Sequence, residues 1–143
     1  MEYKHTQKGY MLGGSLIGMA AILAGISAHI GWKPASIVVE IVLLGTAVLF
    51  YSLTVSVTGG ELVIRFGPGL IRKRIPLSRI RDARIVRNPW YYGWGIHLTP
   101  HGWLYNVSGL AAVEVDYISG GRFRIGTDDP KGLLQAIKER STA

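Results

Sequence analysis

The sequence contains no cysteine, so it can form neither a disulfide nor a thiolate metal site. Charge is also scarce before Gly59, where the chain has three lysines, two glutamates and no arginine. From Gly59 onward there are thirteen lysines and arginines against seven acidic residues, so nearly all of the net charge of +7 lies there. The 143 residues therefore divide into an apolar N-terminal part and a basic C-terminal part.

Recognisable catalytic motifs are missing as well. The chain has no glycine-rich phosphate loop between a strand and a helix, and no serine, histidine and acid in a known nucleophile motif. His97 and His101 fall on a predicted strand and its turn, where their spacing does not align two metal ligands as it would on a helix. Glu114 and Asp116 lie two apart on one predicted strand, with Arg124 as the expected neighbour of Asp116. We therefore predict no catalytic residue, cofactor or metal.

Two apolar runs predict a membrane-embedded helical hairpin. Residues 9–30 carry no formal charge, and a helix of that length covers ~33 Å, enough to cross a hydrocarbon core. The run is too long for the apolar region of a signal peptide, and no small-residue cleavage site follows it. Residues 35–51 form a second candidate span at the lower length limit, after a turn of sequence GWKP. The prediction is two spans within residues 1–52.

The charge distribution predicts the orientation. Lys4 and Lys8 precede the first span, only Lys33 lies between the spans, and the basic part follows the second span. The positive-inside rule then places both termini in the cytoplasm of a multi-pass inner-membrane protein.

Small residues recur along the first predicted span and would let another helix approach closely: Gly14, Gly18, Ala21, Gly25 and Ala28. Packing against the second span is the preferred interpretation, and a homo-oligomer interface is the alternative. His29 and Glu40 are polar residues near the outer ends of the two spans. Glu40 could bond to His29 or reach headgroups. A small membrane subunit that handles ions or protons through Glu40 is an alternative function.

Alternating residues around turn signals predict three β-hairpins. In the first, a Gly59-Gly60 loop pairs Leu53 with Phe66 at its far end. In the second, residues 99–102 form the turn, and the pairs on one face are Leu98 with Trp103, Ile96 with Tyr105, and Trp94 with Val107. We expect these aromatic residues to be mostly core.

The third hairpin has a predicted loop of residues 119–121, which sets Tyr117 opposite Phe123 and Asp116 opposite Arg124. A closing helix follows, with Asp129 as its N-cap and an apolar stripe that includes Leu133 and Ile137.

Four segments together resemble bacterial pleckstrin-homology-like (PH-like) domains that follow a short membrane anchor: RIPLSRI, YGWGI, YNVSGLAAVEV and GGRFRIGTDDP. The resemblance covers roughly residues 53–140. It implies two N-terminal transmembrane helices followed by an all-β PH-like barrel or sandwich of about seven antiparallel strands over residues 53–143, capped by a C-terminal helix. It implies binding or scaffolding rather than catalysis. The lysine- and arginine-rich first hairpin of phosphoinositide-binding PH domains is missing here, because the loop is Gly59-Gly60.

The densest run of positive charge predicts a contact surface, made of Arg72, Lys73, Arg74, Arg79, Arg81, Arg84 and Arg87, with only Asp82 nearby in sequence. The predicted partners are the bilayer, anionic lipid headgroups or an acidic protein. A solvated polar face is the simpler interpretation. Nucleic acid is disfavoured, because the aromatic residues are predicted to pair within a core rather than to form a stacking platform.

Overall fold

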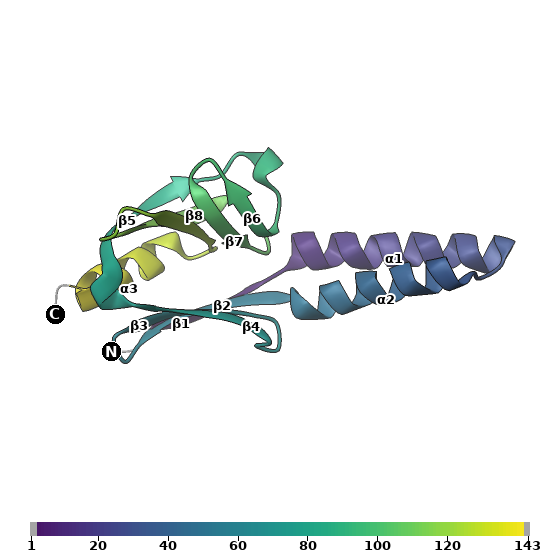
Figure 1. The fold of residues 1–143 in the computed structure, drawn as a ribbon, viewed down its shortest axis with the longest axis horizontal. Helices are drawn as coiled ribbons and strands as arrows, with labels where there is room; N and C mark the ends of the chain where they lie inside the picture. The colour runs from purple at the N-terminus through teal and green to yellow at the C-terminus, as the bar shows by residue number, and fades with distance from the viewer. Residues whose placement is uncertain (1–2, 142–143) are drawn as a thin grey trace.

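The computed structural model describes residues 3–141, which form a β domain with a helical hairpin projecting from one end (Figure 1). The helices are α1 (Tyr10–Ile30), α2 (Pro34–Leu49) and α3 (Pro130–Ser141), with short 3-10 turns η1 (Leu77–Arg79) and η2 (Trp90–Tyr92). The strands are β1 (Tyr3–Lys8), β2 (Ser52–Thr58), β3 (Glu61–Phe66), β4 (Ile71–Pro76), β5 (Ile80–Arg87), β6 (Gly95–Thr99), β7 (Gly102–Asn106), β8 (Ala111–Tyr117) and β9 (Arg122–Gly126).

The helical hairpin turns at residues 31–33. Pro34 begins α2, and the Ser36 hydroxyl accepts a hydrogen bond from the Lys33 amide at 3.0 Å, which caps the helix start. Ala20 and Ser27 of α1 are buried, seven residues apart and on one side of the helix. Most other apolar side chains of both helices are exposed. The hairpin is therefore apolar on its outside, the reverse of a soluble helix pair.

The expectation of two membrane spans is wrong, because among the helices of residues 3–141 only α1 is long and apolar enough to cross a membrane. Its 21 residues reach ~32 Å, whereas the 16 residues of α2 reach only ~24 Å, less than a hydrocarbon core of ~30 Å. The chain leaves the helix at Phe50 and enters β2 at once, so residues 50 and 51 do not lengthen α2. A multi-pass protein is accordingly not supported.

Sheet A has the strand order β1-β2-β3-β4, all antiparallel. The predicted first hairpin is confirmed, with Leu53 opposite Phe66 across the Gly59-Gly60 turn. Both glycines have positive φ, which is what a two-residue hairpin loop requires. Strand β1 comes from before the helices and pairs with β2, so the β domain contains residues from both sides of the helical hairpin.

Sheet B has the order β5-β8-β9-β7-β6. The expectation of about seven antiparallel strands is wrong on two counts: the described residues form nine strands, and β7 runs parallel to β9. Strand β1 escaped prediction because its sequence, YKHTQK, is polar and has the composition of a membrane flank. The parallel pair joins strands separated in sequence by β8, which hairpin patterns do not detect.

The two sheets enclose one core, and α3 closes one side of it (Figure 1). Leu133 and Ile137 of α3 are almost fully buried, and the Gly132 amide donates to Asp129 Oδ1 at 3.2 Å, so the predicted cap and apolar stripe are confirmed. Tyr3 of β1 also donates to Asp129 Oδ2 at 2.9 Å. These contacts fix α3 against the edge of sheet A.

Two predictions about sheet B need correction. In the third hairpin Val115 pairs with Phe123 and Asp116 with Arg122, two residues from the expected register. A two-residue slip keeps every side chain on its predicted face, so alternation alone cannot detect it. In the second hairpin Leu98–Trp103 and Ile96–Tyr105 pair as predicted, but the pairing begins at Gly95 rather than Trp94.

Most aromatic side chains between positions 90 and 109 lie outside the buried core, contrary to the prediction. Tyr105 is buried, but Trp103 is 47% exposed, and Trp90 and Tyr91 in η2 are 77% and 68% exposed. Trp103 lies near the open side of sheet B, because β6 is an edge strand with no partner beyond it in the described part of the sheet.

Candidate functional site

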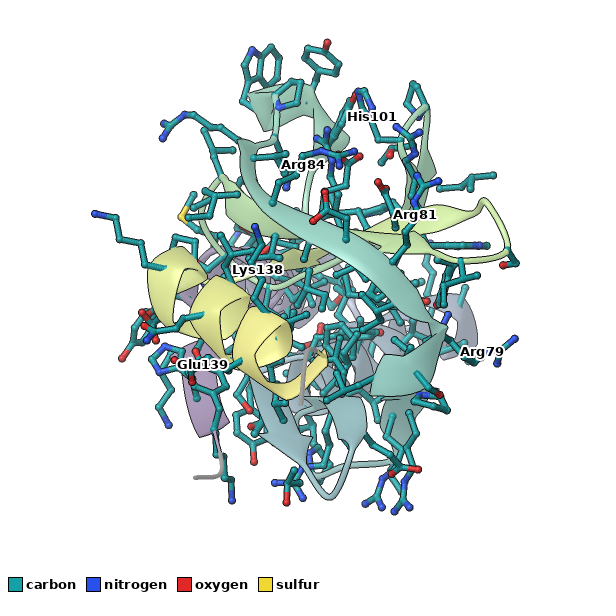
Figure 2. The ribbon with its side chains drawn as sticks, turned by 90° about the vertical axis from the view of Figure 1, so that its left-hand side faces the viewer. Arg79, Arg81, Arg84, His101, Lys138 and Glu139 are labelled. Carbon is teal, nitrogen blue, oxygen red and sulfur yellow. The ribbon has the colours of Figure 1, made fainter. Side chains whose placement is uncertain are left out.

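The predicted run of positive charge is divided among three places. Along β4 the side chains alternate, so Arg72 and Arg74 point outward from sheet A while Lys73 points between the sheets. Arg79 ends η1 and lines a hollow with Lys73 and Arg74. Beyond η1 the chain enters sheet B, where β5 carries Arg81 and Arg84 (Figure 2) and then Arg87. Alternation and the change of sheet therefore separate residues that are adjacent in sequence.

The outer face of sheet A carries a set of cations that we call the basic face: Lys4, Lys8, Arg65, Arg72 and Arg74. Four of them surround a shallow hollow of about 300 Å³ whose floor includes the hydroxyls of Thr54 and Ser56. Among the described residues none of these five cations has a carboxylate partner, and the only acid on this face is Glu61 at its far end. Hydroxyl donors ringed by unpaired cations are suited to an anionic partner.

On sheet B, by contrast, four arginines lie close to carboxylates. Arg84 contacts Glu114 at 2.7 Å and Asp116 at 3.0 Å, and both carboxylates are almost fully buried. Arg81 lies 3.6 Å from Asp116, and Arg122 and Arg124 approach the same pair from β9. We call these six residues the sheet B ion cluster.

The cluster controls the protonation of Asp116. Burial by itself raises the pKa of this carboxyl, but the hydrogen bond from Arg84 and the charges of Arg84, Arg122 and Arg81 outweigh burial and hold the pKa below its ordinary value. The pKa of Arg84 is correspondingly raised, chiefly by its hydrogen bond to Asp116. Two carboxylates surrounded by four arginines have a structural role rather than that of a general acid or base.

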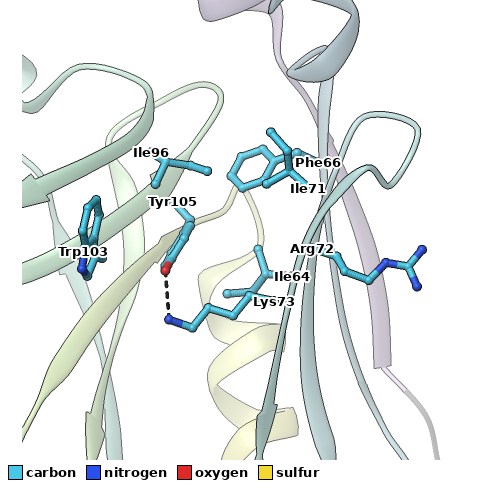
Figure 3. Close-up of a pocket in the computed structure, with 8 residues that line it drawn as sticks. All are labelled: Ile64, Phe66, Ile71, Arg72, Lys73, Ile96, Trp103 and Tyr105. Carbon is cyan, nitrogen blue, oxygen red and sulfur yellow. Dashed lines mark hydrogen bonds between the residues drawn. The ribbon is translucent and has the colours of Figure 1, made fainter.

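A cleft opens between the sheets on the side opposite α3. Its volume is about 320 Å³, and β3, β4, β6 and β7 line it (Figure 3). The walls are mainly apolar, formed by Ile64, Phe66, Ile71, Ile96 and Trp103. This cleft was not predicted from the sequence, because hairpin patterns do not show which sheet edges face each other.

Lys73 is the cation inside this cleft. Its Nζ donates to the Tyr105 hydroxyl at 3.0 Å and lies 5.4 Å from the Tyr105 ring centroid and 5.7 Å from that of Phe123. Burial lowers the pKa of Lys73, but hydrogen bonds and charge interactions with Tyr105 and Tyr117 outweigh it, so the pKa is raised. No carboxylate pairs with Lys73 in the part of the chain that the structure describes.

The small residues of α1 that were predicted to pack against the second helix do not lie on the buried side of α1. Gly14, Gly18, Ala21, Gly25 and Ala28 are all exposed, and α1 buries Ala20 and Ser27 instead. Gly14, Ala21 and Ala28 each lie one position after a buried residue of α1 (Gly13, Ala20 and Ser27), a difference too fine for composition to resolve.

The polar residues of the hairpin are not joined either. His29 is exposed, whereas Glu40 is half-buried with Oε2 out of contact with water, and no hydrogen bond links the two in residues 3–141. His97 contacts the Trp94 carbonyl, and no group of three potential metal ligands occurs among the described residues.

Exposed apolar side chains gather at the end of the β domain from which the helical hairpin projects. Leu70 in the β3–β4 turn is 80% exposed, and Trp90 and Tyr91 occupy η2 (Figure 1). The turn lies against α2, since a Cβ at Gly67 would be 2.5 Å from the Leu49 carbonyl. We call Leu70, Trp90 and Tyr91 the hairpin-end rim.

Comparisons with known proteins give no relative for this arrangement: no protein-family model matches the chain, and no curated protein matches its sequence.

Proposed function

We propose that the protein is a membrane-anchored, non-enzymatic binding module that presents its basic face to an acidic partner at the cytoplasmic surface of the membrane. The observation that carries this proposal is the unpaired state of the basic face, in contrast to the neutralised arginines of sheet B. The resemblance to membrane-anchored PH-like domains supports a binding role and rests on the quoted sequence segments alone.

The helical hairpin supports the anchor. α1 has the length and composition of a membrane helix, and its exposed face is apolar, so insertion removes that surface from water. Rigid connections join it to the domain: the Gly9 amide donates to the Tyr51 carbonyl at 2.7 Å, and the Leu12 amide to the Val107 carbonyl at 3.2 Å. The hairpin-end rim then lies at the depth where tryptophan and tyrosine favour the interface.

The orientation of sheet A favours a protein partner over the bilayer surface. β1 and β2 continue in the direction of the helices, so the basic face stands upright on the membrane (Figure 1). Lys8, Arg65 and Arg72 lie toward the hairpin end of the face and can reach headgroups. Arg74 lies two residues beyond Arg72, ~7 Å further out, and Lys4 lies four residues beyond Lys8, so both face the cytoplasm.

The proposal is tested with full-length protein in nanodiscs of neutral phosphatidylcholine and a fluorescent poly-glutamate octapeptide as the probe. Arg72→Gln with Arg74→Gln should weaken peptide binding about tenfold, because each exposed ion pair contributes up to about 1 kcal/mol. The matched control is Arg79→Gln with Arg87→Gln on the sheet B side, which should leave binding unchanged. Equal losses in both double variants would contradict a specific basic face.

Anchoring is tested separately by alkaline carbonate extraction of membranes that contain the full-length protein. The protein should stay in the membrane fraction. Release into the soluble fraction would rule out the anchor, whatever the outcome of the peptide experiment.

A further inference from the structure

We infer that the cleft between β4 and β6–β7 is a binding site for a single-chain amphiphile with a carboxylate head, such as a fatty acid. The site uses Lys73 rather than the basic face, because Arg72 also lines the cleft but its guanidinium points away from it (Figure 3). The inference of a ligand in the cleft can therefore be tested independently of the proposed acidic partner.

The first argument is the shape and lining of the cleft. Pockets for small ligands range from about 300 to 1,000 Å³ and are mainly apolar with a few polar groups. The cleft, at about 320 Å³, is at the small end of this range, which suits one alkyl chain rather than a double-chained lipid. Phe66, Ile71 and Ile96 form its apolar part on the side of the helical hairpin (Figure 3).

The second argument is the charge. Lys73 carries a half-buried ammonium that donates to the Tyr105 hydroxyl and lies over two aromatic rings. A buried charge without a counter-charge is costly, and an anionic ligand would supply that counter-charge. Lys73 also lines a second hollow of about 220 Å³ with Arg74, Arg79 and Tyr117, so both of the other charged side chains there are again positive.

The two arguments together define how the ligand would lie. The carboxylate accepts hydrogen bonds from Lys73 Nζ and from the Tyr105 hydroxyl, which has a hydrogen to donate because Nζ bonds to its oxygen. The alkyl chain runs along Phe66, Ile71 and Ile96 toward the end of the domain from which the helical hairpin projects (Figure 3). This polarity distinguishes a fatty acid from a neutral apolar ligand, which would gain nothing from Lys73.

The test uses full-length protein in phosphatidylcholine nanodiscs, with a palmitate analogue that carries a photoactivatable diazirine near the middle of its chain. Labelled peptides are identified by mass spectrometry, and oleate and oleyl alcohol serve as competitors. Label is expected in peptides of β3, β4, β6 or β7, and oleate should compete at least about tenfold better than oleyl alcohol. Label confined to α1 and α2 would overturn the inference, as would equal competition by the two compounds.

Substitutions of Lys73 test whether its ammonium group binds the carboxylate. Lys73→Met should weaken oleate competition between about 10- and 100-fold, the range for a hydrogen bond to a charged group, and should abolish the advantage over oleyl alcohol. Lys73→Arg should retain that advantage. Arg74→Met, one residue along and on the opposite face, is the matched control and should bind as the wild type does.

Two results would refute the ligand class. If oleate competes for labelling of Lys73→Met as well as it does for the wild type, the ammonium does not bind the ligand. If lysophosphatidylglycerol competes more strongly than oleate, the head group is a phosphate rather than a carboxylate. If Lys73→Met fails to fold, the oleate to oleyl alcohol ratio in the wild type decides the question without it.

Discussion

The two sheets of the β domain carry similar numbers of cations and use them differently. On sheet B, four arginines converge on Glu114 and Asp116, and the group holds β5, β8 and β9 together. On sheet A, five cations share one face, and the only described acid on that face is Glu61 at its far end. Positive charge along a sequence therefore does not by itself identify a binding surface. The position of the nearest carboxylate in space separates a structural arginine from an available one.

The largest expected effect comes from breaking the sheet B ion cluster. Glu114→Ala should lower the free energy of unfolding by about 3 kcal/mol, because it leaves Arg124, which is 7% exposed, without its carboxylate. The value is at the low end for a broken buried pair, since Arg84 and Arg122 are themselves partly in solvent. Denaturant unfolding in detergent, followed by tryptophan fluorescence, measures it. Asp82→Ala, an exposed acid on β5, is the control, and a loss as large as that of Glu114→Ala would contradict a specific cluster.

The next effect concerns the connection between sheet A and the helices. Gly67 has φ of +49°, and a Cβ there would be 2.5 Å from the Leu49 carbonyl. Gly67→Ala should therefore destabilise the protein by about 2 kcal/mol, through backbone strain and displacement of the β3–β4 turn. Gly60→Asn is the control, because its Cβ meets open space and asparagine tolerates positive φ. Similar stability of the two variants in a thermal melt would show that the turn does not rest on α2.

A smaller effect should appear as a pH dependence of the ion cluster. The pKa of Asp116 is lowered in the folded protein, so its ionised form stabilises the fold above the unfolded pKa of about 3.9, and that contribution is lost as pH falls through the folded pKa. The wild type should therefore lose more stability between pH 5 and pH 3 than Asp116→Asn. Melting temperatures across this range provide the measurement. Parallel curves would show that Asp116 does not contribute to acid sensitivity.

The smallest effect on stability is expected on sheet A. Arg72→Gln and Arg74→Gln remove cations that have no carboxylate partner among the described residues, so each should change the free energy of unfolding by less than about 0.5 kcal/mol. The same denaturation experiment checks this. A loss above 1 kcal/mol would mean that the basic face is structural, and the contrast between the sheets would disappear.

Local patterns predicted part of the fold. The Gly59-Gly60 hairpin, most of the second hairpin and the α3 cap follow from turn residues and alternation, which act over a few neighbours. Three other features depend on contacts between residues that are distant in sequence: strand β1, the parallel β7–β9 pair and the length of α2. Sequence periodicity does not contain that information.

The candidate site was predicted less well than the fold. Arg72 and Arg74 were identified from charge, but Lys4, Lys8 and Arg65 join them only through the pairing of β1 and β3 with their neighbours. Alternation along β4 was available in the sequence and would have placed Lys73 on the opposite face from Arg72 and Arg74. The carboxylates that neutralise Arg81 and Arg84 are some 30 residues away, so no local pattern could have paired them.

The pairing of β1 with β2 also sets an order of events during synthesis. These strands flank the helical hairpin in sequence. Sheet A therefore cannot be completed until α1 and α2 have formed and the two ends of the hairpin, at Gly9 and Tyr51, have come together. A newly made chain whose helices had not come together would carry β2 as an uncovered sheet edge, the kind of surface that aggregates or is degraded. Completion of the β domain thus reports whether α1 and α2 have come together correctly.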